Sequence, residues 1–299
     1  MRLPYLLVDA FTRTPGTGNR AAVLLDARGL SAAQMRDIAQ NLETSETVFV
    51  TDWHENIFTV RFFTPVREIE FAGHAAIALA VTLVLQGKIE REVSHLYLQT
   101  PADNVPIQID SDEAGVVQAV MREPAPRFRD VVSWSVLQDL LLALGINERY
   151  LHRGLPSGVA FSGLWSAFVP LIAPGLVDEL EPDMERLIEL CSALEVDTIH
   201  AYAPVGPRSY YARDFAPVLG IPEDPVTGTA NGALAALLAR AGVVPRREGS
   251  AEIQVLQGHH LGVPGVVKVR VEYAVTGEPY AVYVGGPAVV VHSGLVSVQ

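Results

Sequence analysis

Two helices that are apolar on every side constrain this 299-residue chain more than any other feature. The sequence predicts one from about Gly73 to Gln86 and the other from about Thr227 to Ala241, each followed by a glycine. A helix without a polar face must be covered all round. Because the flanking segments are strand-rich, we expect a sheet curled around each helix. The alternative is a helix held between a sheet and a partner subunit.

The two helices belong to an internal repeat. Residues 63–66 (FTPV) are echoed by residues 215–218 (FAPV), 152 positions later. The glycine turn that begins at Gly73 is echoed 155 positions later, at Gly228. The helix end at Leu42, which leads into a strand, is echoed 152 positions later. Three echoes in the same order at nearly one spacing predict a duplicated domain.

The predicted fold is therefore α+β, with two similar domains. Each is a curled, mostly antiparallel, barrel-like sheet around a central apolar helix. We place the N-terminal domain at residues 1–121, with or without the C-terminal strand, and the C-terminal domain at residues 128–299. The Pro-rich, charged segment 122–127 is typical of a linker. Residues 285–287 (GGP) predict a bend or bulge in the last strand.

Composition excludes several classes of protein. A net charge of −12 argues against general nucleic-acid binding but permits a small anionic substrate. The longest uncharged apolar stretch, residues 71–86, is too short for a membrane span. The first residues lead into a strand without a signal-peptide layout, which predicts a cytoplasmic protein. The single cysteine, Cys191, lies on an apolar helical stripe and is predicted to be a packing residue.

Glu46 and His74 are candidates for proton transfer. Glu46 lies where a helix gives way to an apolar strand, a position that can raise the pKa of a carboxyl group. His74 falls in the first turn of its helix, where unpaired backbone N–H groups attract carboxylates. The alternatives are a solvated loop glutamate and a buried histidine bonded to the backbone.

A second set of candidates opens the second apolar helix. Asp224 precedes it, Thr227 or Thr229 can cap it, and Gly228 allows close approach of a ligand to the backbone. The positive helix end favours an ionised Asp224 and a neutral His74. Asp224 can also be no more than a turn or capping residue. If the two copies face each other, two helix N-termini converge on one small anion.

No cofactor or metal motif competes with these residues. His259 and His260 are adjacent but have no accompanying ligand set. No Walker A sequence is present, and residues 16–20 (GTGNR) lack the context of a dinucleotide site, so we interpret them as a turn. We therefore expect no cofactor and no metal.

At these motifs the chain resembles the phenazine-biosynthesis PhzF-like family, which has the diaminopimelate epimerase type of fold. The resemblance covers essentially the whole chain. It consists of an ordered series: Val8-Asp9-Ala10-Phe11, Gly18-Asn19, Ser45-Glu46-Thr47, Phe63-Thr64-Pro65, Gly73-His74, residues 224–230, Gln257-Gly258 and Val284-Gly285-Gly286.

The resemblance implies an active site between two domains, a homodimer, and isomerisation of trans-2,3-dihydro-3-hydroxyanthranilate without metal or cofactor. In that scheme a glutamate takes a proton from one ring carbon and returns one to another. Glu46 matches that glutamate. The supporting positions are matched by His74, Asp224 and Thr229, and the substrate-carboxylate contacts by the N–H groups of Gly73 and Gly228.

The chain departs from the family pattern at three places, one of which is Ala102-Asp103 in place of a usual Ala-Gly. Arg20 stands where proline usually follows Gly-Asn, and residues 263–265 (VPG) replace a common Arg-Pro-Ser. Cofactor-independent racemases of this fold use two cysteines, and this chain has one. The leading hypothesis is a one-base isomerase. The alternatives are a one-base epimerase, hydratase or lyase on the same site, and a non-catalytic protein that binds small acids.

Overall fold

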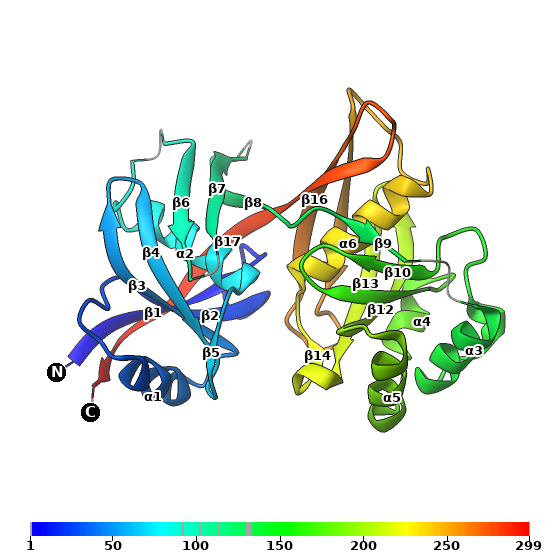
Figure 1. Cartoon of the computed structure of the whole chain (residues 1–299), viewed down its shortest axis with the longest axis horizontal. Coiled ribbons are helices and arrows are strands. Elements are labelled where there is room, and N and C mark those ends of the chain that lie inside the picture. The colour runs from blue at the N-terminus through cyan, green and yellow to red at the C-terminus, as the bar shows by residue number, and fades with distance from the viewer. Residues whose placement is uncertain (1, 91–92, 102, 113, 130–132, 299) are drawn as a thin grey trace. The chain divides into compact units, whose positions relative to one another are not determined.

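A computed structural model describes residues 2–90, 93–101, 103–112, 114–129 and 133–298. The chain divides into two compact units (Figure 1). Unit 1 comprises Met1–Arg122 with Gly285–Gln299, and unit 2 comprises Glu123–Val284. The assignment of residues 1–121 and 128–299 to two domains stays a prediction.

Unit 1 is a sheet closed around one helix. Its sheet follows the pairing order β17–β1–β2–β3–β4–β6–β7–β8, and β8 pairs with β17 again. The pairs β2–β3 and β4–β6 are parallel, and the pairs β1–β17, β1–β2, β3–β4, β6–β7 and β7–β8 are antiparallel. The elements are β1 (Arg2–Ala10), β2 (Asn19–Leu24), α1 (Ala32–Leu42), β3 (Glu46–His54), β4 (Ile57–Phe63), β5 (Glu68–Ile69), α2 (Gly73–Leu85), β6 (His95–Gln99), β7 (Asn104–Ser111), β8 (Val117–Arg122) and the second part of β17 (Pro279–Ser297).

Unit 2 repeats this plan. Its strands pair in the order β10–β11–β12–β13–β15–β16–β17, with parallel pairs at β11–β12 and β13–β15. The elements are β9 (Arg127–Phe128), α3 (Trp134–Ala143), η1 (Glu148–Tyr150), β10 (Gly158–Phe161), β11 (Trp165–Pro170), α4 (Pro174–Asp178), α5 (Met184–Leu194), β12 (Thr198–Gly206), β13 (Ser209–Ala216), η2 (Pro217–Leu219), β14 (Ile221–Asp224), α6 (Gly228–Arg240), β15 (Ser250–Gln257) and β16 (Gly265–Tyr273).

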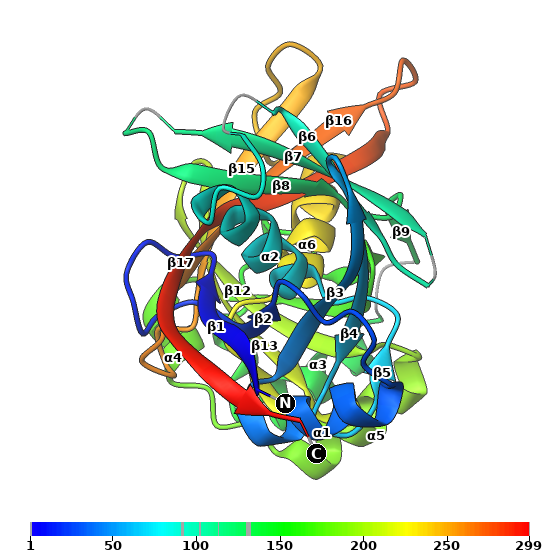
Figure 2. The same ribbon diagram turned by 90° about the vertical axis from the view of Figure 1, so that its left-hand side faces the viewer.

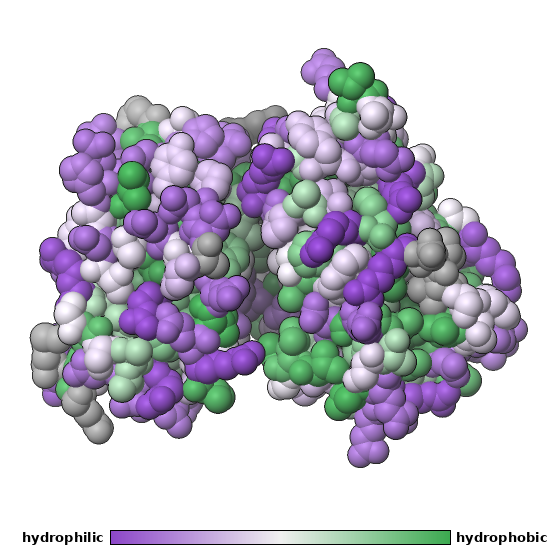
Figure 3. Space-filling view, in the orientation of Figure 1, coloured by the Kyte–Doolittle hydropathy of each residue, from purple (hydrophilic) through white to green (hydrophobic). Residues whose placement is uncertain are grey.

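The apolar helices lie inside their sheets, as the sequence predicts. Every residue of α2 from Ala75 to Val84 is buried, and α2 packs against β1, β2, β3, β7 and β8 (Figure 2). In the same way α6 packs against β10, β11, β15 and β16. The face in Figure 3 is mostly hydrophilic, with hydrophobic residues in small groups. The predicted α+β fold of two similar barrel-like units is confirmed.

Details of the two units recur at the spacings of the sequence echoes. Arg61 binds Glu68 through two short contacts of 2.7 and 2.6 Å, and Arg213 binds Glu223 in the same way at 2.9 and 2.7 Å. Both α1 and α5 end in a left-handed residue, a glutamate with φ near 50° in each unit. Helix α1 begins with a capping box, in which Ser31 and Gln34 each accept a bond from the other's backbone N–H.

Strand β17 runs without a break through residues 285–287, where the sequence predicts a bend or bulge, and the chain passes from unit 2 to unit 1 at Gly285. A Cβ atom on Gly285 would lie 2.5 Å from the carbonyl oxygen of Ala119 and 2.9 Å from the Cα of Val120. The glycine therefore permits close approach of two strands. Among the helices that the structure describes, none is long and apolar enough to cross a membrane.

We expect Gly285→Ala to destabilise the protein by roughly 1–3 kcal/mol, because the new methyl group meets backbone atoms that cannot move aside. The measurement is the free energy of unfolding from urea denaturation. Gly175→Ala is the control, since a Cβ there meets no atom within 4 Å. Equal stability of the two variants would contradict the close approach of the strands at Gly285.

Candidate active site

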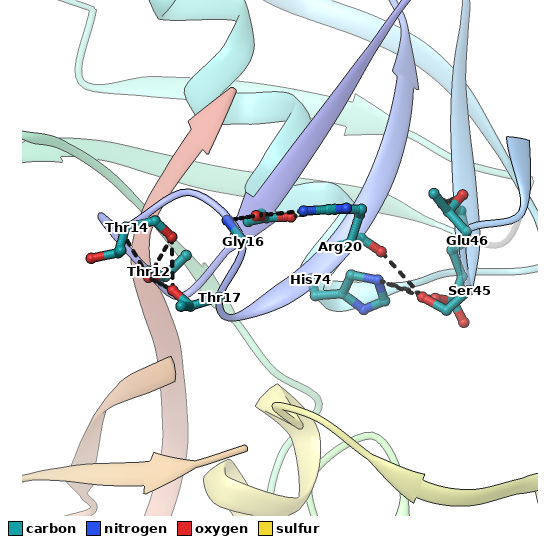
Figure 4. A network of polar contacts seen from close by, with 10 residues as sticks. Thr12, Thr14, Gly16, Thr17, Arg20, Ser45, Glu46 and His74 are labelled. Carbon is teal, nitrogen blue, oxygen red and sulfur yellow. Dashed lines mark hydrogen bonds and ion pairs between the residues drawn. The ribbon is translucent and has the colours of Figure 1, made fainter. Parts of the chain in front are cut away.

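Glu46 and His74 lie against each other in unit 1. Glu46 is the first residue of β3, and His74 is the second residue of α2. His74 Nε2 is 3.0 Å from Glu46 Oε2, and the two side chains are 12% and 13% exposed. Among the described residues Oε2 has no other partner. The structure therefore joins the predicted acid and the predicted imidazole in one nearly buried pair (Figure 4).

The backbone around Glu46 is held from two sides. Helix α1 stops at the left-handed Glu43, and the chain then turns into β3. The Thr44 hydroxyl donates to the carbonyl oxygen of Glu46 at 3.0 Å. Across the parallel pair β2–β3, Glu46 lies opposite Ala21. These contacts fix the backbone of Glu46 at the start of β3. Glu46 is therefore not the solvated loop glutamate of the alternative interpretation.

Ser45 ties this pair to the turn between β1 and β2. Its hydroxyl donates to the carbonyl oxygen of Arg20 at 3.2 Å and lies 3.5 Å from His74 Nε2 (Figure 4). The guanidinium of Arg20 makes two bonds to the buried Asp9, at 2.7 and 3.0 Å. Asp9 also accepts a bond from the backbone N–H of Gly16 at 2.7 Å. The glycine cluster is thus a turn organised around one buried carboxylate.

The electrostatics of Glu46 differ from the expectation of a raised pKa. Burial pushes the pKa of Glu46 upward and is the largest single effect. The charge of His74, its hydrogen bond and the bond from Ser45 act in the opposite direction and together hold the pKa below its usual value. These effects favour the ionised carboxylate of Glu46, which is the form of a base that can accept a proton.

The start of α2 has no side-chain cap. Its N-cap residue, Ala72, has no group to bond the first-turn N–H groups. Such groups lack partners within the helix and attract anions. At Gly73, a Cβ would lie 2.7 Å from the terminal methyl of Met121, so glycine also lets the helix start pack closely. The first turn of α2, with Gly73 and His74, therefore has no side-chain cap from its N-cap residue and lies beside Glu46.

In unit 2, Thr227 connects two carboxylates. Its hydroxyl lies 2.5 Å from Asp224 Oδ2 and 3.2 Å from Asp214 Oδ2. A hydroxyl has one hydrogen and can donate to only one of the two at a time. Asp224 ends β14 and faces Asp214 across the pair β13–β14. This bridge holds the Asp224 carboxylate just before α6.

Gln257 fixes this threonine. Its side-chain nitrogen donates to the Thr227 hydroxyl at 3.0 Å and to the carbonyl oxygen of Asp224 at 2.9 Å. Its oxygen accepts from the Thr227 backbone at 3.1 Å and from Asn231 at 2.7 Å. The expected capping of α6 by a threonine side chain is wrong for Thr227, the N-cap residue, because these bonds engage its hydroxyl. The first turn of α6, with Gly228 and Thr229, has no side-chain cap there.

Asp214 has a buried partner behind it. His200 Nδ1 lies 2.9 Å from Asp214 Oδ1, and both side chains are fully buried. With the carboxylate as acceptor, the ring carries its proton on Nδ1. Nε2 then has no hydrogen-bond partner among the described residues. The result is a chain of contacts from His200 through Asp214 and Thr227 to Asp224.

The predicted site residues fall into two groups. The structure brings Glu46, His74 and Gly73 together in unit 1, and it brings Asp224, Gly228 and Thr229 together in unit 2. Sequence reasoning missed Asp214 and His200. The signal for Asp214 was present: it occupies the repeat position of Phe62, 152 residues earlier, so a charge stands where the other copy is apolar.

Three other residues considered in the sequence analysis belong to neither group. His259 and His260 are exposed in a turn after β15. Cys191 is fully buried, and burial, aided by Asp214 and Asp197, raises the pKa of its thiol to about 12. Its predicted packing role is confirmed. Within the described part of the chain, no three His, Cys, Asp or Glu side chains are grouped to hold a metal ion.

Comparisons with known proteins identify the family of the chain. The sequence profile of the phenazine biosynthesis-like protein family matches residues 8–294. A Deinococcus radiodurans protein described as an uncharacterized isomerase is 47% identical over 97% of this chain and 94% of its own length. The trans-2,3-dihydro-3-hydroxyanthranilate isomerase of Pseudomonas chlororaphis is 34% identical over 90% of each chain.

Solved structures extend the comparison to the fold. A phenazine biosynthesis protein of the PhzF family from Bacillus anthracis superposes with a TM-score of 0.91 at 30% identity, over 99% of each chain. A hydroxyproline epimerase from Agrobacterium vitis superposes with a TM-score of 0.63 at 12% identity, over 99% of this chain and 91% of the epimerase. The second likeness shows the epimerase type of fold alone.

We expect Thr227→Val to destabilise the protein by about 1–3 kcal/mol, because two carboxylates and the Gln257 amide lose their common partner. Urea denaturation measures this change. Thr227→Ser keeps the hydroxyl and should stay close to wild type. A valine variant as stable as the serine variant would mean that the hydroxyl bridge contributes nothing to folding.

Proposed function

The chain belongs to the phenazine biosynthesis-like protein family and is an isomerase of the PhzF type, and we propose that it moves a proton within a small carboxylic acid. The substrate is a cyclic or amino-acid-like acid. Glu46 is the acid/base group, and neither a metal nor an organic cofactor takes part. The trans-2,3-dihydro-3-hydroxyanthranilate of the Pseudomonas relative is the first substrate to test.

The observation that carries this proposal is the Glu46–His74 pair. Its 3.0 Å contact joins a nearly buried carboxylate to an imidazole at an uncapped helix start. A general base has to be ionised before it reacts, and the lowered pKa of Glu46 supports that state. Gly73 offers backbone N–H groups beside it for the acid group of a substrate.

The proposed reaction has two proton transfers. Glu46 takes a proton from a carbon of the substrate, and the electron pair left behind moves into the conjugated system. The carboxylic acid then returns the proton to a different carbon, so that no atom is gained or lost. When the substrate displaces His74 from Glu46, burial is no longer opposed and favours the protonated acid. The same carboxyl group can thus hold the proton between the two steps.

Unit 2 offers further groups for substrate binding. Asp224, held by Thr227 at 2.5 Å, suits the binding of an amino or hydroxyl group. Gly228 and Thr229, in the first turn of α6, suit an anionic group. A homodimer and a cytoplasmic location complete the proposal, and the mass of the native protein in solution tests the first of these.

One alternative is disfavoured by residue chemistry. A racemase with two thiols needs a second cysteine, and the one cysteine of this chain is buried in the core around α5. A one-base epimerase or lyase differs from an isomerase only in the product. Identifying the product by NMR therefore decides among these three activities.

We expect Glu46→Gln to slow the uptake of solvent deuterium into the substrate roughly 10²–10⁴-fold, since the amide keeps the shape but cannot accept the proton. Mass spectrometry of trans-2,3-dihydro-3-hydroxyanthranilate in D₂O measures this rate. Glu43→Gln is the matched control, an exposed glutamate three positions away.

Wild type and Glu46→Gln are assayed after dialysis against EDTA. The dialysis should leave the wild-type rate unchanged. Turnover by Glu46→Gln within a few-fold of wild type would remove Glu46 from its role. If Asp224→Asn abolishes exchange while Glu46→Gln does not, Asp224 is the base. Loss of the wild-type rate on dialysis, restored by one metal ion, would overturn the cofactor-free reaction.

We expect His74→Gln to change the pH dependence of kcat/KM. In wild type the lowered pKa of Glu46 keeps the base ionised, so activity falls only as the pH drops below the ordinary glutamate value of 4.5. Without the charge of His74, burial dominates and raises the pKa, so the acid limb moves to higher pH. The profile is measured by deuterium uptake, with circular dichroism as a check on folding. An acid limb that does not move would show that His74 does not set the protonation of Glu46.

A further inference from the structure

Glu123 is a buried acid that the proposed reaction does not use. It is the first residue of unit 2, and its backbone N–H donates to the carbonyl oxygen of Val282 at 2.9 Å. The residue is only 5% exposed. Its Oε1 has no hydrogen-bond partner among the residues that the structure describes. A buried polar atom without a partner is costly, so its presence needs a reason.

The carboxyl group lies beside the first turn of α6. A Cβ on Gly163 would be 3.1 Å from Glu123 Oε2 and 2.7 Å from the Thr229 methyl, so these two groups flank the glycine. Thr229 is the second residue of α6. With φ at +102° and no room for a side chain, Gly163 lets both groups pack against its backbone. The acid therefore shares its surroundings with the anion-binding turn of unit 2.

These surroundings keep Glu123 protonated. Burial alone raises its pKa to about 8. No charged group offsets this effect of burial. At neutral pH the group is thus a neutral acid with one O–H to donate.

We propose that Glu123 is a ligand-binding residue of unit 2, which donates its O–H to the anionic group bound at the first turn of α6. This inference rests on the proposed function, since it assigns an acidic substrate to that turn. A neutral acid suits the position, because it adds a donor to the backbone N–H groups. An ionised glutamate there would repel the substrate. Glu123 would accordingly bind and position the substrate, while Glu46 moves the proton.

The test is calorimetric titration of the full chain with 2-aminobenzoate. This probe carries the carboxylate and amino group of the proposed substrate class, and its charge is constant between about pH 6.5 and about pH 9.5. Wild type should bind at least about tenfold more weakly at the higher pH, where Glu123 is ionised. Glu123→Gln keeps a donor but cannot ionise, so its affinity should be the same at both values. Glu123→Ala should bind weakly at both.

Two controls separate this inference from the proposed function. Glu189→Gln, an exposed glutamate of α5, should follow wild type. Glu46→Gln should fail to exchange deuterium yet keep the pH dependence of probe binding that Glu123 sets. If Glu123→Gln retains the wild-type pH dependence, or wild type does not bind the probe, the inference fails, whatever the outcome of deuterium exchange. If the pH dependence disappears in Glu123→Gln but no acid exchanges deuterium, the inference stands and the proposed function fails.

Thermal unfolding provides a readout without a ligand. The folded protein holds the proton of Glu123 up to about pH 8, whereas the unfolded chain releases it near 4.5. The folded state therefore binds more protons between these values, and wild-type stability falls as the pH rises through this range. Glu123→Gln lacks this fall, so its Tm relative to wild type should increase from about pH 5 to about pH 8. A constant Tm difference would show that Glu123 is not a neutral acid in the folded protein.

Discussion

Each unit is organised by a helix that has no polar face. Because α2 and α6 are buried along their lengths, their strands must wrap around them, and the only polar atoms they expose are at the ends. A buried helix with a side-chain cap would satisfy its own first turn. Neither helix has one at its N-cap, so each first turn keeps donors that a ligand can use. The packing requirement that determines the fold also sets where these two uncapped first turns lie.

The two units share a fold but have different polar residues at equivalent positions. Both units keep the Arg–Glu pair and the left-handed glutamate at the end of a helix. The position of Glu46 is occupied in unit 2 by Thr198, which bonds to Ser166 at 2.8 Å in a buried site. The position of Phe62 is occupied by Asp214. The proposed base therefore belongs to unit 1, while unit 2 carries a polar network around Asp224 at a position that is apolar in unit 1.

Much of this could be predicted from the sequence because it depends on periodicity and order. Apolar runs and ordered echoes lead to the helices and the duplication, and motif positions lead to Glu46, His74 and Asp224. The direction of the Glu46 pKa could not be predicted, since it depends on a 3.0 Å contact between residues 28 positions apart. Thr227 was misassigned as a cap for the same reason. Its hydroxyl donates to Asp224 and accepts from Gln257, which lies 30 residues further along the chain.

Glu46 and Glu123 show how the same type of side chain can have two protonation states when it is buried. In both residues the effect of burial is to raise the pKa. At Glu46 an imidazole and a serine hydroxyl outweigh it, so the group rests as a carboxylate and its affinity for a proton rises when the imidazole is displaced. At Glu123 nothing opposes burial, so the group rests as a neutral donor. Neither arrangement favours stability, since one isolates an ion pair from water and the other leaves a polar atom unpaired. In both proposals made above, a bound substrate supplies polar groups that offset this cost.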